Sequence, residues 1–214
     1  MIGKSREMNE LERKLREQYS LYKIDEKETI LDATSALLEK MNSPKISLNQ
    51  LLNEAVRMIH RVLEFQCVTI ALKDYVDGLF RYDTFIGLTP SMENEYRKIE
   101  YSANDLLDSN SFPHIKISRF SYFFMTEDNP YKTGEEMTTF RPGQFSEMRK
   151  HPEDMLDPDY FDVFMFGNAG DIIGWIEAFN TRSGKLPKRE TIRCLELIAS
   201  ALSAVIMAKG FERK

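Results

Sequence analysis

Apolar residues recur along this chain at two spacings, one helical and one extended. From Lys4 to Met41 they fall three or four positions apart, which predicts one long amphipathic helix. Residues 47–62 show the same spacing and form a second predicted helix. A third helical stripe runs from Ile192 to Ile206 near the C-terminus. The pattern therefore predicts two helices at the start of the chain and one at its end.

Runs of β-forming residues lie between these helices. Two pairs of runs flank short turns that contain glycine, a pattern typical of β-hairpins. Several runs are apolar at both odd and even positions, so a sheet built from them must be covered on both faces. The predicted strands are residues 67–72, 79–86, 115–124, 161–166 and 171–180.

The remaining segments would form a second covering layer. Residues 90–99 and 103–107 are predicted to be short helices, whereas residues 126–159 contain four prolines and show no clear period. A stretch of that length is typical of a lid or a binding loop. If the terminal helices cover one face of the sheet, the short helices and the long loop cover the other, where a cavity can form.

The composition fits one sizeable core with an extension rather than two full domains. The chain has 214 residues, 42% of them hydrophobic, and a formal net charge of −5. It has no stripe rich in lysine and arginine, which argues against nucleic acid or an anionic membrane as a partner. It has no signal-peptide core and no apolar run approaching the roughly 20 residues that span a bilayer. We therefore expect a cytoplasmic protein with no membrane partner.

Cys67 and Cys194 are the only cysteines. Each lies in a predicted apolar strand or helix, so we interpret both as small buried hydrophobic residues. The alternative is a redox pair, which a reducing cytoplasm disfavours.

Three segments resemble the GAF domain, a sensory module of signalling proteins. Residues 63–78 are similar to the family's first strand and turn. Residues 121–124, Ser-Tyr-Phe-Phe, are similar to a Ser-Tyr-Phe motif of a subgroup attached to bacterial and archaeal sensor kinases and cyclases. Residues 151–154, His-Pro-Glu-Asp, together with residues 171–191, resemble that subgroup's C-terminal half, because glycines, a proline and acids recur at its separations. The resemblance covers residues 47–208.

The resemblance implies an α+β, GAF-like fold. Its central antiparallel sheet would have about five to six strands, with the terminal helices on one face. Short helices and the long loop would cover a small-molecule pocket on the other face. The resemblance also implies a homodimer through the helices Lys4–Met41 and Ile192–Ile206, which would pass a signal to an output protein or domain. We divide the chain into an N-terminal signalling or dimerisation helix, residues 1–42, and a GAF-like sensory domain, residues 43–214.

The sequence lacks the signatures of several ligand-binding branches of that family. Bilin binding needs a cysteine in the pocket region, but residues 111–114 supply only the histidine, His114. The Asn-Lys-Phe-Asp-Glu pattern of the cyclic-nucleotide branch and the clustered cysteines of the methionine-sulfoxide-reductase branch are missing. The ligand stays unknown, and we expect no catalytic residues.

The predicted strand at residues 171–180 supplies the best pocket candidates. Alternation places Trp175, Glu177 and Phe179 on one face, while Gly174 and Ala178 on the other would let a helix approach closely. Arg119, near aromatic rings and an acid, suits a planar or carboxylate-bearing ligand. The same residues are explained equally well by an aromatic core with an ion pair between Arg119 and Glu177. The candidate ligand-binding residues are Arg119, Tyr122, Phe124, Trp175, Glu177, Phe179 and His114.

Haem and metal ions are minor alternatives. His114 is the histidine best placed to ligate a haem iron, although a lone loop histidine more often caps a turn or lies on the surface. The acidic residues after His151 lack the alternating ligands and central glycine of a calcium loop. Turns and helix caps explain most of them, and we expect no metal site. This acidic cluster consists of Glu153, Asp154, Asp157, Asp159 and Asp162.

These observations favour a small-molecule-sensing, dimerising regulatory domain of a signal-transduction protein. The main alternative is a structural dimerisation module whose pocket is filled by side chains, because the chain has 14 phenylalanines and 11 methionines. An enzyme or redox protein is the third hypothesis, and its simplest version depends on the two cysteines.

Overall fold

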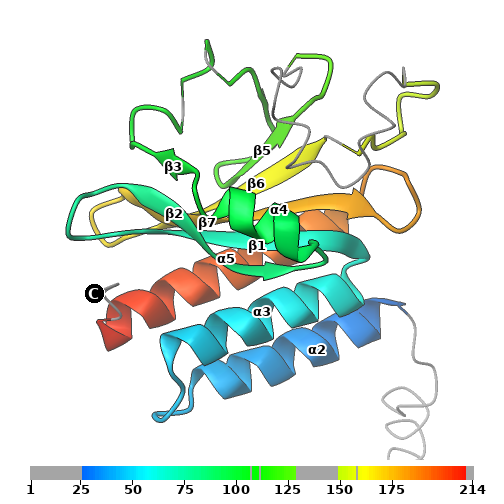
Figure 1. Cartoon of the computed structure of the whole chain (residues 1–214). Helices are drawn as coiled ribbons and strands as arrows, with labels where there is room; N and C mark the ends of the chain where they lie inside the picture. The colour runs from blue at the N-terminus through cyan, green and yellow to red at the C-terminus, as the bar shows by residue number, and fades with distance from the viewer. Residues whose placement is uncertain (1–25, 107, 111, 129–148, 158, 211–214) are drawn as a thin grey trace, which may run out of the picture.

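The computed structural model describes residues 26–106, 108–110, 112–128, 149–157 and 159–210 (Figure 1). The N-terminal half of the helix predicted from Lys4, and most of the predicted long loop, lie outside these residues. The helices are α2 (Glu26–Met41), α3 (Leu48–Val62), α4 (Pro90–Tyr96) and α5 (Arg189–Lys209). The strands are β1 (Phe65–Lys73), β2 (Phe80–Ile86), β3 (Glu100–Tyr101), β4 (Ile115–Lys116), β5 (Ser121–Phe124), β6 (Tyr160–Phe166) and β7 (Ile172–Thr181).

The strands form one antiparallel sheet in the order β3-β2-β1-β7-β6-β5-β4. Helices α2, α3 and α5 lie on one face, while α4 and the β3 region lie on the other (Figure 1). The predicted α+β, GAF-like fold is confirmed. The sheet has seven strands rather than five or six because β3 and β4, two residues each, extend its edges. A strand of two residues has no alternation to read in the sequence.

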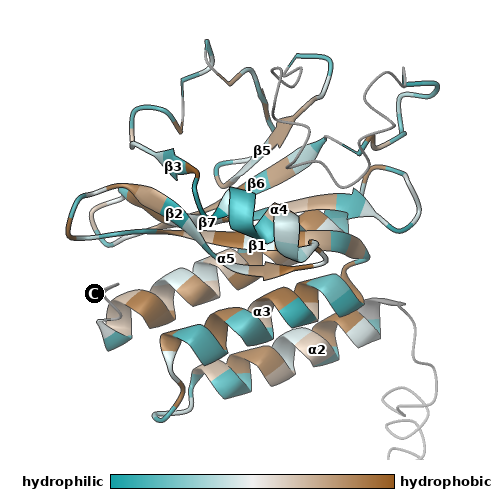
Figure 2. Ribbon diagram, viewed as in Figure 1, coloured by the Kyte–Doolittle hydropathy of each residue, from teal (hydrophilic) through white to brown (hydrophobic). Residues whose placement is uncertain are grey.

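The helices on the first face follow their apolar stripes. Helix α3 starts with a capping box, in which Ser47 accepts from the backbone of Gln50 and the Gln50 side chain accepts in return. Helix α5 ends at Gly210, whose φ of 58° is the left-handed conformation that favours glycine. Figure 2 shows apolar residues along the central strands and polar residues alternating with them around α2 and α3. The core therefore lies between the sheet and these helices.

Three local predictions differ from the structure. Residues 103–106 form a turn rather than a helix. The predicted strand at residues 115–124 is two strands, because the backbone amides of Ile117 and Ser118 both donate to the carbonyl of Ser121 and reverse the chain. Gly174 does allow a close approach, but to β1 rather than to a helix: a Cβ there would lie 2.4 Å from the carbonyl oxygen of Ala71.

Both cysteines are buried and free, as interpreted from the sequence. Cys67 lies in β1, and Cys194 lies in α5 with its Sγ 3.3 Å from Thr34 Oγ1. Burial raises the pKa of the Cys194 thiol, which keeps it in the unreactive protonated form.

Helix α5 is apolar and long enough to cross a membrane by length and composition alone, so the expectation that no segment approaches this limit is wrong. However, 56% of its most apolar window is buried inside the fold. That burial is what a core helix needs, since its apolar face packs on β6 and on the neighbouring helices.

Candidate functional site

A cavity of about 30 Å³ lies on the sheet face opposite α2, α3 and α5. Its floor comes from β2, β6 and β7, and the segment after β3 closes its side. The lining is almost entirely aromatic and acidic. The lining residues are Tyr82, Tyr101, Asp105, Leu106, Phe112, Phe124, Tyr160, Asp162, Trp175 and Glu177.

Strand alternation puts two of these residues in the floor. Trp175 and Glu177 are two positions apart on β7 and therefore project from the same face. The pairing of β6 with β7 then sets Phe164 opposite Trp175 and Asp162 opposite Glu177. The register thus brings two carboxyl groups together beside an indole ring.

Asp162 and Glu177 are buried carboxyl groups without a cationic partner among the described residues. Glu177 accepts a hydrogen bond from the Tyr82 hydroxyl. Burial raises the pKa of Glu177 to about 7, against hydrogen bonds from Tyr82 and Tyr96 that act to lower it. Burial, and then the charge of Glu177, raises the pKa of Asp162 well above its usual value. At neutral pH the pair therefore retains protons that exposed carboxyl groups would lose.

Two polar atoms of this lining have no hydrogen-bond partner among the described residues: Asp162 Oδ1 and Trp175 Nε1. Trp175 is 1% exposed and Asp162 is 8% exposed, so bulk water does not satisfy them. A buried polar group left unpaired destabilises a fold by about 1–3 kcal/mol. Such atoms are suited to binding something that enters the cavity.

Aromatic rings surround Trp175. Its ring centroid lies 5.6 Å from that of Phe80 and 5.8 Å from those of Tyr82 and Tyr101. The contacts of Trp175 with both tyrosines are edge-to-face, a preferred arrangement of aromatic pairs. Phe164 adds a fourth ring at 6.3 Å.

The structure brings together some of the residues predicted for the pocket. Phe124, Trp175 and Glu177 line the cavity. Phe179 lies beside it and stacks on Tyr96 of α4, with the ring centroids 6.5 Å apart.

Tyr122 and His114 pack on each other outside the cavity lining. Their ring centroids are 4.9 Å apart, and His114 Nδ1 lies 2.8 Å from the backbone oxygen of Phe112. The ring nitrogen is therefore engaged with the backbone of its own loop.

Arg119 lies apart from the cavity. Its guanidinium is exposed and sits 5.3 Å from the ring centroid of Phe120. Among the described residues no ion pair joins it to Glu177, whose hydrogen-bond partner is Tyr82. The alternative interpretation, an ion pair between Arg119 and Glu177, is therefore wrong. The suggestion of a carboxylate-bearing ligand also loses its basis, because Arg119 is not part of the cavity lining.

Sequence reasoning missed Tyr82, Tyr101, Tyr160 and the role of Asp162. In the sequence Asp162 belongs to a cluster of acids, but two of the others form ion pairs: Asp154 pairs with Lys185 at 2.6 Å and Asp159 with Arg149 at 2.8 Å. A signal was available, since aspartate is depleted in strands and residue 162 interrupts an apolar run. Its place opposite Glu177 needed the strand register.

A second buried carboxylate connects the sheet to α5. Glu196 Oε1 accepts hydrogen bonds from the hydroxyls of Ser118 and Ser121, the latter at 2.7 Å, and Glu196 Oε2 accepts from Arg193 at 2.6 Å. Burial acts to raise the pKa of Glu196, but these hydrogen bonds outweigh it and hold that pKa below its usual value. This carboxylate is therefore fully ionised and fully bonded.

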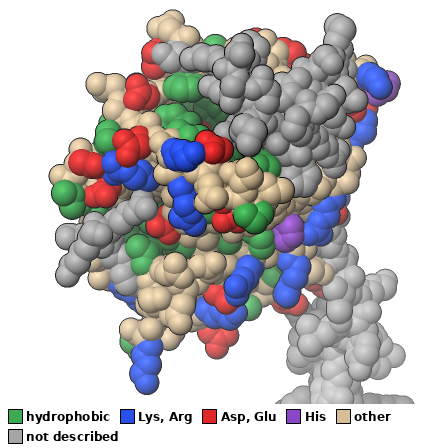
Figure 3. Space-filling view, viewed as in Figure 1, with side chains coloured by type: hydrophobic (Ala, Val, Ile, Leu, Met, Phe, Trp, Pro, Cys, Tyr) green, Lys and Arg blue, Asp and Glu red, His purple; other side chains and the backbone are tan. Residues whose placement is uncertain are grey.

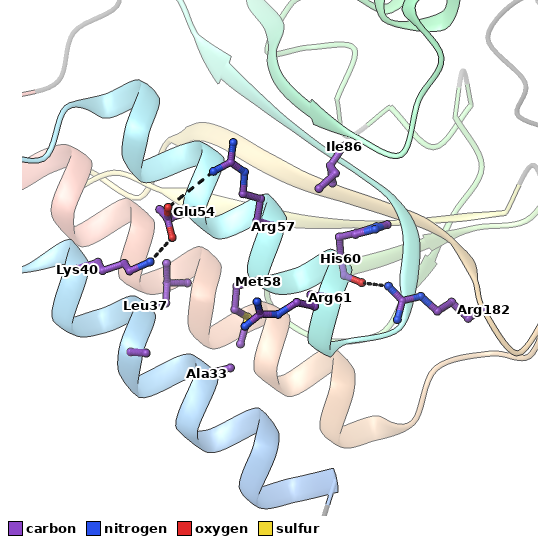
Figure 4. Close-up of a pocket in the computed structure, with 11 residues that line it drawn as sticks. Ala33, Leu37, Lys40, Glu54, Arg57, Met58, His60, Arg61, Ile86 and Arg182 are labelled. Atoms are coloured by element: carbon purple, nitrogen blue, oxygen red, sulfur yellow. Dashed lines mark hydrogen bonds and ion pairs between the residues drawn. The ribbon is translucent and has the colours of Figure 1, made fainter.

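A larger groove of about 630 Å³ lies on the helical side, between α2, α3 and the end of β7 (Figure 4). Arg57 and Lys40 both contact Glu54 there, and Arg182 donates to the backbone oxygen of His60 at 2.7 Å. Figure 3 shows Lys and Arg side chains on this side of the molecule. Its cations are largely exposed and solvated.

The fold is that of GAF domains in solved structures. One is the GAF domain of an Acinetobacter phosphoenolpyruvate-protein phosphotransferase, with a TM-score of 0.55 and 14% identity over 86% of this chain and 96% of that one. Another is the A. aeolicus nlh2 GAF domain in an inactive state, with a TM-score of 0.55 and 10% identity over 86% of this chain and 99% of that one. The match to a GAF domain/HD domain protein from Geobacter sulfurreducens has a TM-score of 0.54 and 12% identity over 81% of this chain and 97% of that one.

No model of a protein family matches the sequence, and no curated protein does. The similarity to these structures therefore establishes the GAF fold of the chain.

Proposed function

We propose that this chain is a cytoplasmic regulatory domain of a signal-transduction protein, which binds a small molecule in the cavity above β6 and β7. The fold supports this role, because the solved structures that share it include a domain of a methyl-accepting chemotaxis protein. The unpaired Asp162 Oδ1 and Trp175 Nε1 carry the proposal. They are buried polar atoms that a ligand can satisfy and that packing alone leaves unpaired.

The same sheet provides a route from the cavity to α5. Phe124 lines the cavity at the end of β5, and Ser121 at the start of β5 donates to Glu196 of α5. A ligand that shifts β5 would therefore act directly on the helix. The proposed signal is a change in the position of α5 relative to α2.

Dimerisation through the helices Lys4–Met41 and Ile192–Ile206 is the second element of the proposal. Leu31 on α2 is 64% exposed and Leu197 on α5 is 49% exposed, which leaves apolar surface on both helices. A second copy would bury such side chains.

Native mass spectrometry of the freshly purified chain tests both elements at once. We expect a dimer that carries a bound small molecule, and a ligand-free preparation whose melting temperature rises with a metabolite extract. A monomer at high micromolar concentration in light scattering would contradict the dimer.

A structural dimerisation module is the second candidate, and the small volume of the cavity favours it. About 30 Å³ admits only a few atoms unless side chains move. If no metabolite changes the melting temperature while the dimer persists, this second candidate replaces the first.

A further inference from the structure

The lining of the cavity is acidic and contains no cation among the described residues. Asp105, Asp162 and Glu177 supply carboxyl groups, and every other lining residue except Leu106 is aromatic. Asp105 accepts hydrogen bonds from the backbone amide and hydroxyl of Ser102, both at 2.7 Å, so its carboxylate is already engaged. Asp105 is also exposed, whereas Asp162 and Glu177 are buried, and Asp162 Oδ1 has no hydrogen-bond partner among the described residues. The ligand would therefore meet Asp162 and Glu177.

We propose that this cavity binds the ammonium group of a small amine that also carries an oxygen acceptor. The ammonium lies between Asp162 and Glu177, and Trp175 Nε1 donates a hydrogen bond to the oxygen. The inference rests on the proposed ligand-sensing function and gives the chemical class of its ligand.

The geometry of β6 and β7 sets the spacing of these groups. Asp162 and Glu177 are direct cross-strand partners, which places their Cβ atoms about 4.5–5.5 Å apart. One cation can therefore contact both carboxyl groups. Trp175 is two residues from Glu177 on the same face of β7, about 7 Å along the strand. A ligand whose nitrogen and oxygen are separated by a few bonds spans that distance.

The aromatic rings favour an organic cation. The centroids of Tyr82 and Tyr101 each lie 5.8 Å from that of Trp175. Organic ammonium groups are attracted to such ring faces, and the attraction is stronger where water is excluded. Tyr82 also donates to Glu177, which orients that carboxyl group.

Other ligand classes fit this lining less well. An anion would meet the acids without a basic side chain, since Arg119 lies outside. A hard metal ion needs several oxygen ligands, and no group of three or more His, Cys, Asp or Glu able to hold a metal occurs among the described residues.

The size of the cavity limits the group that it holds. About 30 Å³ exceeds the roughly 10–15 Å³ that one water needs, so the space admits an ammonium group with a few attached atoms. A bulkier ligand would require the side chains of Tyr101, Leu106 or Phe112 to shift.

Binding a cation should release protons from the acid pair. The pKa of Glu177 is about 7, and the pKa of Asp162 is raised well above its usual value. A bound ammonium stabilises both anions, so its affinity should rise as the pH increases from 6 to 8. The other titratable groups that face the pair are Tyr82, Tyr96, Tyr101 and Asp105.

Trp175 provides the readout, because it is the only tryptophan in the chain. Its single indole N–H resonance is followed during titration with three probes of similar size: 3-amino-1-propanol, n-butylamine and 1,3-propanediol. The first has the ammonium and the oxygen, the second lacks the oxygen, and the third lacks the charge. We expect 3-amino-1-propanol to bind at least tenfold more tightly than 1,3-propanediol, and several-fold more tightly than n-butylamine.

Two variants assign the binding to the acid pair. Asp162→Asn and Glu177→Gln should each weaken 3-amino-1-propanol binding at least tenfold while leaving 1,3-propanediol unchanged. Glu39→Gln, at an exposed position on α2, is the matched control and should bind as the parent chain does. Calorimetry gives the affinities, and the thermal melting curve of each variant checks that it is folded.

Three results would overturn the inference. The first is equal binding of the amine and the diol. The second is amine binding that survives both acid variants. The third is occupancy of the cavity by a neutral or anionic compound in native mass spectra, with no competition from amines. In that third case the cavity is still a ligand site, so the sensing function stands without the ammonium. If no probe or metabolite of any charge perturbs Trp175, the sensing function falls as well.

Discussion

Two glutamates of this fold are almost equally buried and have opposite electrostatic surroundings. Glu177 is 5% exposed and Glu196 is 6% exposed. Glu196 accepts hydrogen bonds from two serines and an arginine, which hold its pKa low. Burial raises the pKa of Glu177 to about 7, although hydrogen bonds from two tyrosines act to lower it. Burial acts to raise the pKa of both acids, and the hydrogen bonds from the serines and the arginine outweigh that effect only at Glu196.

The difference separates a structural contact from a candidate binding site. The hydrogen bonds of Glu196 are complete, and they hold α5 against the turn before β5. The acid pair of the cavity has an unpaired oxygen, Asp162 Oδ1, beside an unpaired indole nitrogen. Buried polar atoms without a partner are expected at functional sites, so this difference supports the ligand site proposed above.

The largest expected effect is a pH dependence of stability that the acid pair causes. Between pH 4.5 and 7 the folded chain keeps a proton on Glu177 that the unfolded chain has lost, so stability falls as pH rises through this range; the raised pKa of Asp162 acts in the same direction. A shift from 4.5 to about 7 corresponds to at most about 3 kcal/mol. Urea unfolding at half-unit pH steps measures it, and a stability that rises steadily from pH 5 to 7 would contradict the raised pKa.

Glu196 should act in the opposite direction. Because its pKa is lowered, its contribution is present above the usual glutamate pKa and is lost as the pH falls below that value. Glu196→Ala leaves two serine hydroxyls without their acceptor and should destabilise the fold by about 2 kcal/mol at pH 7. Urea unfolding at pH 7 tests this, and a change below about 0.5 kcal/mol, typical of surface substitutions, would show that α5 is held by packing alone.

The double variant Asp162→Asn/Glu177→Gln should be more stable than the parent chain at pH 8, by about 1 kcal/mol, since it removes two buried acids that ionise unfavourably. Between pH 4.5 and 7 its free energy of unfolding should no longer change with pH. If the variant is instead less stable at pH 8 and its stability still falls between pH 4.5 and 7, other groups cause the pH dependence.

Arg193→Gln should have the smallest effect, below about 0.5 kcal/mol, because the arginine side chain is 57% exposed and water screens its ion pair with Glu196. Thermal melting of this variant beside Glu196→Ala separates the serine contacts from the exposed charge. An equal loss in both would assign the stabilisation to the arginine.

Much of the fold follows from local patterns, and the site follows only in part. Alternation along β7 is sufficient to predict that Trp175 and Glu177 share one face. The helical spacing of apolar residues is sufficient to predict α3 and α5. Asp162 required the register of β6 against β7, which depends on which residues pair across the hairpin rather than on either strand alone. Tyr82 and Tyr101 come from strands that reach the cavity only through the order of the whole sheet.

Arg119 shows the limit of reading side-chain direction from a loop. Arg119 is grouped with Tyr122 and Phe124 as a pocket candidate, but only those two residues lie inside β5. The turn at Ile117 and Ser118 instead leaves the arginine in solvent above Phe120. Alternation holds only inside a strand, and residue 119 lies just before one.

Carboxyl carbon NMR of the two glutamates tests the central contrast most directly. Glu177→Gln and Glu196→Gln assign the two side-chain resonances, and a titration from pH 3 to pH 9 follows each. We predict that Glu177 titrates near pH 7 and that Glu196 titrates below the usual glutamate value. If both resonances titrate together near the ordinary glutamate pKa, the cavity does not raise the pKa of Glu177, and the account of the cavity is contradicted.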